Sequence, residues 1–281
     1  MKIAFLADFF VEDGINGGGE LNNEELIKLL INKGNDVKKY HTRGLTIQNL
    51  PDKETKLIVA NFVALTEEVK DYIKKNYSYV IYEHDHKYLK TRDPSPFKDY
   101  LAPKDQIINR DFYSNANAII CQSRLHMNVV QRNLELDNVI SVSGNLWSEK
   151  LLDYLEQIST DQEDKKDICS IMYSNIWNKN VEGSIMYCRA KGFEFEKIMP
   201  CSHKEFLTKL NKNKTLVFFP KTLETLSRIV VEARMLNCKV ATNKKIGATS
   251  EEWFHLKGKC LINKMREKRL QIPEIVLKYL E

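Results

Sequence analysis

The stretch that decides the fold is residues 215–242, which read TLVFFPKTLETLSRIVVEARMLNCKVAT. Thr215–Phe219 is a short apolar run typical of a buried strand, Ser227–Leu236 has apolar residues at helical spacing, and Lys239–Thr242 reads as another strand. Strands that alternate with helices form parallel sheets with both faces covered. The stretch therefore predicts an α/β fold built on a parallel sheet.

The same alternation extends over the rest of the chain. Short apolar runs predict strands at 2–7, 37–40, 56–60, 79–82, 118–121, 139–142, 168–173 and 196–199. Helical spacing predicts helices at 22–33, 66–76, 123–133, 181–191, 203–210 and 273–280. Because a polar stretch at 160–167 separates two such series, we expect two doubly wound domains, 1–147 and 148–281, with the last helix able to pack on the first domain. Ligands would bind at the carboxyl ends of the strands, in a cleft between the domains.

Composition excludes several classes of protein. Of the 281 residues 43% are apolar and 29% charged, as in a globular protein rather than a disordered or fibrous one. No apolar run approaches the ~18 residues of a membrane span, and residues 1–8 read as a first strand rather than a signal peptide. The six cysteines include no C-x-x-C pair. We expect a protein of the cytoplasm, of the cell or of an infected host cell, whose net charge of +5 permits an anionic substrate.

A glycine-rich loop follows the first strand. It reads Asn16-Gly17-Gly18-Gly19-Glu20 and precedes the first predicted helix. Glycines let backbone N–H groups approach a ligand closely, and a helix N-terminus favours an anion. The loop matches neither the dinucleotide fingerprint nor the P-loop. It is either an anion-binding loop, with Gly18 and Gly19 against the ligand, or a simple turn.

Two glutamates lie eight positions apart at the predicted helix 227–236, one before it and one within it. Glu224 is expected in the loop after the strand and Glu232 two turns into the helix, near one helical face. Their carboxylates can accept hydrogen bonds from sugar hydroxyls, and the N–H groups of Ser227 and Arg228 can meet a phosphate. The alternative is a pair of solvated glutamates, which the apolar run 229–231 beside Glu232 disfavours.

On these residues the sequence resembles retaining glycosyltransferases of the GT-B architecture, in particular glycosyltransferase family 4. The resemblance rests first on the E-x7-E motif from Glu224 to Glu232, with Phe218-Phe219-Pro220 before it. Weaker matches follow the family's order along the chain: Gly18-Gly19-Glu20 with the segment to Val37, Ala116–Ser123, and Cys238–Gly247. The family implies two Rossmann-like domains facing each other across a cleft and a nucleotide-sugar donor, with a UDP-sugar favoured.

The resemblance also implies roles for single residues. Glu224 would contact the donor sugar and Glu232 the ribose, while Lys179 matches the lysine that clamps the diphosphate. The partner arginine is missing, and Arg228 is the candidate substitute. Thr225 and Ser227 stand where the family has glycines. The expected donor-binding residues are Glu232, Lys179, Arg228, Ser227, Thr225, Leu226, Gly18 and Gly19.

The segment Tyr82-Glu83-His84-Asp85-His86 follows a predicted strand. Three interpretations compete: a metal site, which lacks an evident further ligand; a capped loop with satisfied polar groups; and an acceptor-side site where His84 or Asp85 touches the donor sugar or the acceptor hydroxyl. The resemblance supports the third, since a histidine or acid often follows this strand in the family. The predicted catalytic residues are therefore Glu224, His84 and Asp85.

Two further segments are candidates for acceptor binding. Residues 88–110, with Pro94 and Pro96, read as a long loop that either recognises the acceptor or is an ordinary surface excursion. Residues 257–269 hold six cations against Glu267 and are either a solvated face or a surface for an anionic acceptor or membrane.

These features predict transfer of a hexose, with retention, from a nucleotide-diphosphate sugar to an acceptor hydroxyl. The acceptor is a glycan or lipid-linked saccharide, or a hydroxymethylated DNA base as in phage DNA modification, which would have to be extruded from the duplex. Since no D-x-D motif is present, we expect no metal site, no obligatory metal and no cofactor. The alternatives are an inactive nucleotide-sugar-binding protein of the same fold, and another GT-B-like activity such as a phosphorylase or epimerase.

Overall fold

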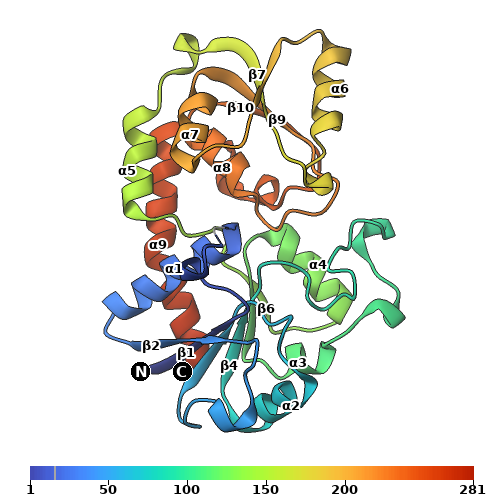
Figure 1. Ribbon diagram of the computed structural model, residues 1–281, viewed down its shortest axis with the longest axis vertical. Helices are drawn as coiled ribbons and strands as arrows, with labels where there is room; N and C mark the ends of the chain where they lie inside the picture. Colours follow the sequence, from blue (N-terminus) through green and yellow to red (C-terminus); the bar gives the residue numbers. More distant parts are fainter. Residues whose placement is uncertain (16) are drawn as a thin grey trace. The chain divides into compact units, whose positions relative to one another are not determined.

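The computed structural model describes residues 1–15 and 17–281, with Gln162 described by its backbone alone. The chain divides into two compact units (Figure 1). Unit 1 comprises Met1–Trp147 and Lys268–Glu281, and unit 2 comprises Ser148–Glu267. Each unit contains one parallel sheet with helices packed on it, which confirms the predicted α/β class with two doubly wound sheets.

The sheet of unit 1 has the strand order β2-β1-β3-β4-β5-β6, and neighbouring strands are parallel. Its strands are β1 (Lys2–Ala7), β2 (Asp36–His41), β3 (Lys56–Val59), β4 (Tyr79–Tyr82), β5 (Ala118–Cys121) and β6 (Val139–Ser141). The helices are α1 (Gly18–Asn32), α2 (Glu67–Asn76), α3 (Arg110–Ser114), α4 (Arg124–Leu134) and the second half of α9 (Gly258–Leu280). From β1 the strand order runs in one direction to β2 and in the opposite direction to β3, so the switch point lies between β1 and β3. Open α/β sheets bind ligands at such a point.

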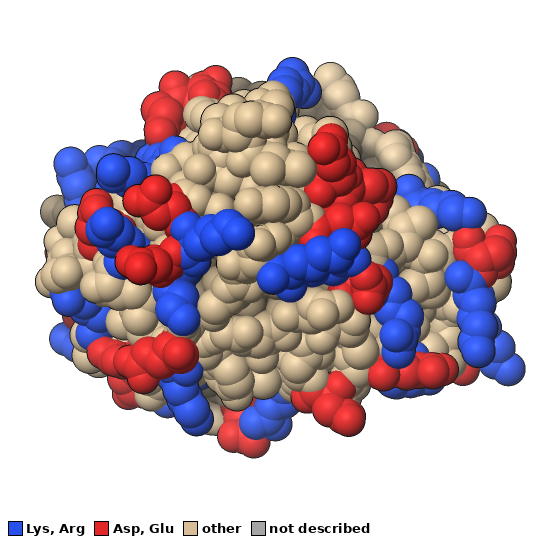
Figure 2. All heavy atoms as spheres, turned by 90° about the horizontal axis from the view of Figure 1, so that it is seen from below, with Lys and Arg blue, Asp and Glu red and all other residues tan. Residues whose placement is uncertain are grey.

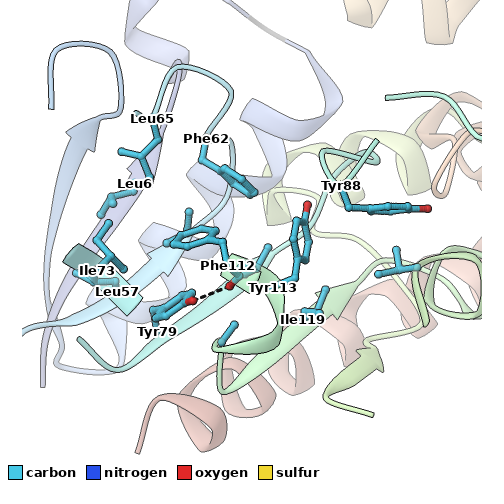
Figure 3. Packing of buried hydrophobic residues seen from close by; sticks show 14 of the residues in the cluster. Leu6, Leu57, Phe62, Leu65, Ile73, Tyr79, Tyr88, Phe112, Tyr113 and Ile119 are labelled. Atoms are coloured by element: carbon cyan, nitrogen blue, oxygen red, sulfur yellow. Dashed lines mark hydrogen bonds between the residues drawn. The ribbon is translucent and has the colours of Figure 1, made fainter. Parts of the chain in front are cut away.

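Alternate residues of the central strands enter opposite cores, because successive side chains of a strand point to opposite faces. Ala4 and Leu6 of β1 belong to one buried cluster, whereas Ile3 and Phe5 belong to another. The first cluster is rich in aromatic rings, which Figure 3 shows gathered between the sheet and the helical segment 110–114. There the Tyr79 hydroxyl donates a hydrogen bond of 2.6 Å to the Phe112 carbonyl, and the rings of these two residues stack on each other.

The second core is closed by two helices from the opposite ends of the chain. Leu26 and Leu30 of α1 are fully buried in it, and so are Ile272, Val276 and Leu280 of α9. Residues four apart lie on one face of a helix, so α9 presents a continuous apolar stripe. This burial explains why the last residues of the chain belong to unit 1.

The sheet of unit 2 has the order β10-β9-β7-β8 and is also parallel. Its strands are β7 (Lys166–Met172), β8 (Phe195–Ile198), β9 (Asn213–Phe218) and β10 (Lys239–Thr242). The helices are α5 (Glu149–Ile158), α6 (Val181–Lys191), α7 (His203–Asn211), α8 (Arg228–Met235) and the first half of α9. Read from β8 to β10, this is the same order as β2-β1-β3-β4 in unit 1: second, first, third and fourth strand. The switch point of unit 2 therefore lies between β7 and β9.

Several helices differ from the sequence-based prediction, and the short α3 was not predicted. Helix α1 begins at Gly18 rather than at residue 22, because the chain already enters the helix at Gly17, its N-cap. Helix α5 was not predicted, although Ser148 caps it by accepting a hydrogen bond from the Leu151 N–H. Helix α9 is continuous from residue 258, with Pro273 inside it, so the basic run is helical. Among the described helices none is long and apolar enough to cross a membrane.

The cations of the basic run are largely used within the units. The Arg266 guanidinium binds three carboxylates of α5, those of Glu149, Asp153 and Glu156, at 2.7 Å each. In unit 1 the Arg269 guanidinium lies 2.9 Å from the Glu25 carboxylate. These pairs fix α9 to its neighbours, and this structural role weakens the interpretation of the run as a binding surface.

Asp8 ties together the loops at the switch point of unit 1. Its carboxylate accepts hydrogen bonds from the N–H groups of Val63 at 2.9 Å and Ala64 at 3.0 Å, and from the hydroxyl of Thr42. The carboxylate therefore joins the end of β1 to the loops after β2 and β3.

Asp8→Ala should lower the free energy of unfolding of unit 1 by about 2–4 kcal/mol, because it leaves the donors of this junction without their charged acceptor. Urea denaturation followed by circular dichroism measures the change. The exposed Asp36 at the start of β2 supplies the matched control, Asp36→Ala, which should cost no more than about 0.5 kcal/mol. Equal losses in the two variants would contradict this role.

Candidate functional site

In unit 1 a polar cluster lies where four strands end at the same edge of the sheet. Its members are His84 after β4, Gln122 after β5, Asn145 after β6, and Asn23 in the helix that follows β1. The Asn23 amide oxygen is 2.5 Å from His84 Nε2, and the Gln122 amide nitrogen is 2.6 Å from His84 Nδ1. The Asn145 amide donates in turn to Gln122 at 2.9 Å. This network assigns the imidazole proton to Nε2.

Electrostatics keep His84 neutral. Burial, aided by the positive charge of Lys87, lowers the pKa of His84 to about 3. At neutral pH the imidazole can donate and accept hydrogen bonds but is a weak general base. The predicted catalytic residue is therefore placed as a hydrogen-bonding group at the carboxyl edge of the sheet.

The glycines of the first loop lie beside this cluster. Gly18 and Gly19 form the first turn of α1 rather than a loop, while Asn16 lies outside the described residues. A β-carbon at position 19 would sit 3.5 Å from Cγ of His84, so the backbone of this turn packs closely on the imidazole. The N–H groups of a first helical turn have no acceptor within the helix. The structure thus brings Gly18, Gly19 and His84 together in one unit.

Asp85 belongs to a buried ionic cluster. Lys87 is 2% exposed, and its ammonium binds both the Glu83 carboxylate, which is fully buried, and Asp85 at 2.7 Å. The Tyr113 hydroxyl donates a further hydrogen bond to Glu83. Burial alone would raise the pKa of Asp85, but the adjacent Lys87 holds it below its usual value, so the half-buried Asp85 is ionised.

Most polar groups of the segment after β4 are therefore satisfied, as in a capped loop, although Nε2 of His86 is buried without a hydrogen-bond partner in the described chain. Asp85 also lies 3.5 Å from the Arg92 guanidinium, and the His86 ring approaches the Tyr88 hydroxyl at 3.0 Å. Across the described parts of the chain, residues 1–15 and 17–281, no three His, Cys, Asp or Glu side chains are placed to hold a metal ion. A catalytic role for His84 and Asp85 remains a prediction.

In unit 2 the carboxyl ends of β7 and β9 bring Glu224 and Lys179 together. The Lys179 ammonium, in the loop after β7, lies 2.7 Å from the Glu224 carboxylate. The backbone of Glu224 is fixed by the loop after β10: its N–H donates to the Lys245 carbonyl at 2.8 Å, and its carbonyl accepts from the Gly247 N–H at 2.8 Å. Glu224 lies outside α8, so helical geometry does not place it on one face with Glu232.

The entry to α8 is strained and holds an unused polar atom. Ser227 caps the helix with φ +74°, in the left-handed region that favours glycine, which accounts for the glycine expected there from the family. Its side-chain oxygen is buried without a hydrogen-bond partner in the described chain. Leu226 before it is 1% exposed and anchors the turn, while Thr225 is half-buried. A buried orphan oxygen beside helix N–H groups is a natural place for an anion.

Glu232 has a partner that the sequence analysis missed. It is 3% exposed, and its carboxylate lies 3.0 Å from Nε2 of His203 and 3.8 Å from Nε of Arg228. The hydrogen bond to Glu232 raises the pKa of His203. His203 opens α7 just after the capping Ser202, a position at which the sequence pattern signals only a helix start. Its role depends on a contact between two helices that spacing does not reveal.

Comparison with known proteins adds evidence on the fold. No protein-family model matches the chain, and no curated protein matches it. The solved structure of HepE from Anabaena in complex with UDP is 13% identical, with a TM-score of 0.52 over 100% of this chain and 96% of HepE. A UDP-forming α,α-trehalose-phosphate synthase from Burkholderia vietnamiensis is 9% identical, with a TM-score of 0.53 over 83% of this chain and 72% of that chain.

A third solved structure is less similar. It is an α-glucosyltransferase in complex with UDP and a 13-mer DNA containing an HMU base, at 11% identity and a TM-score of 0.48, with 100% of this chain and 96% of that chain covered. HepE and the synthase show that this chain has the fold of GT-B proteins. Membership of glycosyltransferase family 4 stays a prediction.

Lys87→Met should lower the free energy of unfolding by about 3–5 kcal/mol, because it leaves the Glu83 carboxylate buried and unpaired. The double variant Glu83→Gln/Lys87→Met should recover part of this loss, since both charges are then absent. Chemical denaturation measures both, and Lys98→Met at an exposed position is the control. A double variant no more stable than Lys87→Met would contradict the pairing.

Lowering the pH from about 7 to about 5 should reduce the free energy of unfolding by about 2–4 kcal/mol. Burial lowers the pKa of His84 to about 3 and of His126 to about 4, and that of His86 falls in the same direction. The unfolded chain therefore binds more protons between pH ~6.5 and ~4, so stability is lost as the pH falls. Two groups oppose this loss because their pKa is raised in the folded protein: Glu83, to about 7 by burial, and His203, through its hydrogen bond to Glu232. The three histidines outweigh them. Urea denaturation across this range tests the slope, which a flat profile would contradict.

Proposed function

We propose that the protein is a retaining glycosyltransferase that uses a nucleotide-diphosphate sugar, with a UDP-sugar favoured. The observation that carries the proposal is the edge of unit 2, where Lys179 meets Glu224 and a helix N-terminus with the buried, unpartnered Ser227 hydroxyl follows. HepE has been solved with UDP-glucose bound, and its shared fold supports this donor class. Unit 2 is the proposed donor-binding domain and unit 1 the proposed acceptor domain.

The arrangement suits the electrostatics of glycosyl transfer. The sugar passes through an oxocarbenium-like state while the diphosphate leaves with growing negative charge. Lys179, Arg228 and the N–H groups at the start of α8 would stabilise that charge. Glu224 would accept hydrogen bonds from the donor sugar and Glu232 from the ribose. We propose that protein groups alone neutralise the diphosphate, without an obligatory metal or cofactor.

The acceptor hydroxyl is proposed to bind in unit 1 beside the neutral His84 and the ionised Asp85. His84 can hydrogen-bond a hydroxyl without carrying charge, and Asp85 next to it in the chain is an ionised carboxylate. The first turn of α1 lies beside His84, and its Gly18 and Gly19 stay proposed as donor-binding residues. The candidate acceptors are a glycan or lipid-linked saccharide and a hydroxymethylated DNA base.

A second candidate function is a nucleotide-sugar-binding protein without turnover. The geometry at Ser227 favours it, because a serine in the left-handed region places a side chain where the family has glycine. The carboxylate of Glu232 is also already bound to His203 in the structure. Nucleotide binding without hydrolysis or transfer would distinguish this function from the enzyme.

Donor binding is tested first by thermal shift with UDP, GDP, ADP and their sugar conjugates, with and without Mg²⁺. UDP should raise the melting temperature by mass action, and Glu232→Ala should remove the shift. The control Glu205→Ala alters an exposed glutamate of α7 and should keep it. No shift with any nucleotide would refute the donor site, while a shift that requires Mg²⁺ would refute metal independence.

Turnover is tested by release of UDP from UDP-sugars, alone and with saccharides or hydroxymethylated DNA as acceptors. Glu224→Ala should reduce turnover by a factor of about 10²–10³, the size expected when a preorganised polar contact to the transition state is lost. UDP binding should persist in this variant, which shows that the fold is intact. Full activity in Glu224→Ala would overturn the assignment, and the anomeric configuration of the product tests retention.

A further inference from the structure

Unit 1 contains a cavity of about 380 Å³ that the proposed mechanism leaves unused. It lies beyond the carboxyl ends of β3 and β4 and is lined by Phe62, Val63, Leu65, Glu67, Lys70, Lys87, Leu89, Lys90, Arg92, Ile108 and Asn109. Its volume is in the range of small-molecule sites. Four of the lining side chains are cationic and one is acidic, which makes the cavity the most informative feature outside the donor site.

The cationic side chains of the cavity differ in burial: Lys70 is buried, whereas Lys90 and Arg92 are exposed. Lys70 is 6% exposed and donates to Asn109 at 2.7 Å and to Glu67 at 2.6 Å. The Glu67 side chain is 81% exposed, so this ion pair is well screened and weak. An ammonium has three donors, and the described contacts of Lys70 use two of them.

Two cations at the rim face solvent. Within the described residues Lys90 has no ion-pair partner, and the Arg92 guanidinium approaches only Asp85, at 3.5 Å. Lys90 is therefore available to an incoming anion, and the half-exposed Arg92 can reach one because its contact with Asp85 is long. Asp85 also binds Lys87 of the cavity wall, so the cavity adjoins the edge where His84 and Asp85 lie.

The remaining wall is apolar. Phe62, Leu65 and Leu89 are buried behind the cavity, whereas Val63 and Ile108 are exposed at 57% and 36% and form an apolar rim. Figure 3 shows the Phe62 ring at the border of the aromatic core, above Phe112 and Tyr113. Such a wall suits the apolar face of a ring, and the cations suit a charged group attached to it.

We propose that this cavity binds the acceptor, and that the acceptor carries a phosphate or carboxylate beside an apolar ring face. The inference rests on the proposed function and adds the charge class of the substrate. On the face of the molecule in Figure 2, positive and negative side chains are interspersed, so a discrete cavity is a better anion site than that surface. The anionic group can come from a charged saccharide or from the backbone of a nucleic acid.

The test measures binding of glucose 6-phosphate, glucuronate and glucose by isothermal titration, with UDP present at saturation to fill the donor site. The charged sugars should bind at least ten-fold more tightly than glucose. The double charge reversal Lys90→Glu/Arg92→Glu should weaken them at least ten-fold and leave UDP binding unchanged. The neutral variant Lys90→Gln/Arg92→Gln should show a smaller loss in the same direction.

The matched control is Lys98→Glu/Lys104→Glu, which makes the same change in net charge at exposed positions of the same loop region outside the cavity. It should bind the charged sugars as the unaltered protein does. A hydroxymethylated oligodeoxynucleotide forms a separate arm: weaker binding in the rim variant than in the control supports a nucleic-acid source for the anion. If both pairs of variants weaken every anion equally, the effect is one of net charge and the proposed cavity site is overturned.

The remaining outcomes separate this inference from the function on which it rests. If UDP binds but charged sugars and the oligonucleotide show no advantage over glucose, the acceptor class is wrong while the transferase proposal stands. If UDP does not bind, the transferase proposal fails, and with it the assignment of the cavity to an acceptor.

Discussion

The buried pair of Glu83 and Lys87 is the interaction on which the candidate acceptor side depends. Both side chains lie directly after β4, and neither reaches solvent. A buried charge without its partner is so costly that the segment between them has few other conformations available. That segment carries His84 and Asp85, and Lys87 forms part of the cavity wall. One ionic contact therefore positions the His84 imidazole, the Asp85 carboxylate and one wall of the proposed acceptor cavity.

Much of the architecture was predictable because strands buried on both faces produce short, uniformly apolar runs. The runs at β1, β4 and β5 were predicted with the bounds that the structure has, since each is followed by a polar residue. Helix α5 was missed even though Ser148 marks its start, and α9 was shortened because Pro273 reads as a helix start rather than an interior residue. The pattern shows periodicity, but an interior proline is tolerated only when tertiary packing stabilises the helix around it.

The candidate site could be predicted from the sequence only for residues that lie in loops after strands. Lys179 lies in the segment after β7, and Glu224 and Ser227 lie in the loop after β9. The topology of a parallel sheet brings these two segments to one edge. The bond between His203 and Glu232 joins two helices whose packing no spacing encodes. The cavity of unit 1 was hidden for the same reason, because its lining comes from three separate stretches between residues 62 and 109. Single motifs thus indicated the donor chemistry, whereas contacts between distant segments required the structure.

Helix α9 determines when unit 1 can complete its folding during synthesis. Its apolar stripe fills the core of the first unit, yet these residues are synthesised after the whole of unit 2. At roughly 5–20 residues per second, the N-terminal sheet waits on the order of ten seconds for its final layer. During that time Leu26 and Leu30 of α1 lack their C-terminal partners. Unit 1 therefore cannot complete its core until the second unit has been translated.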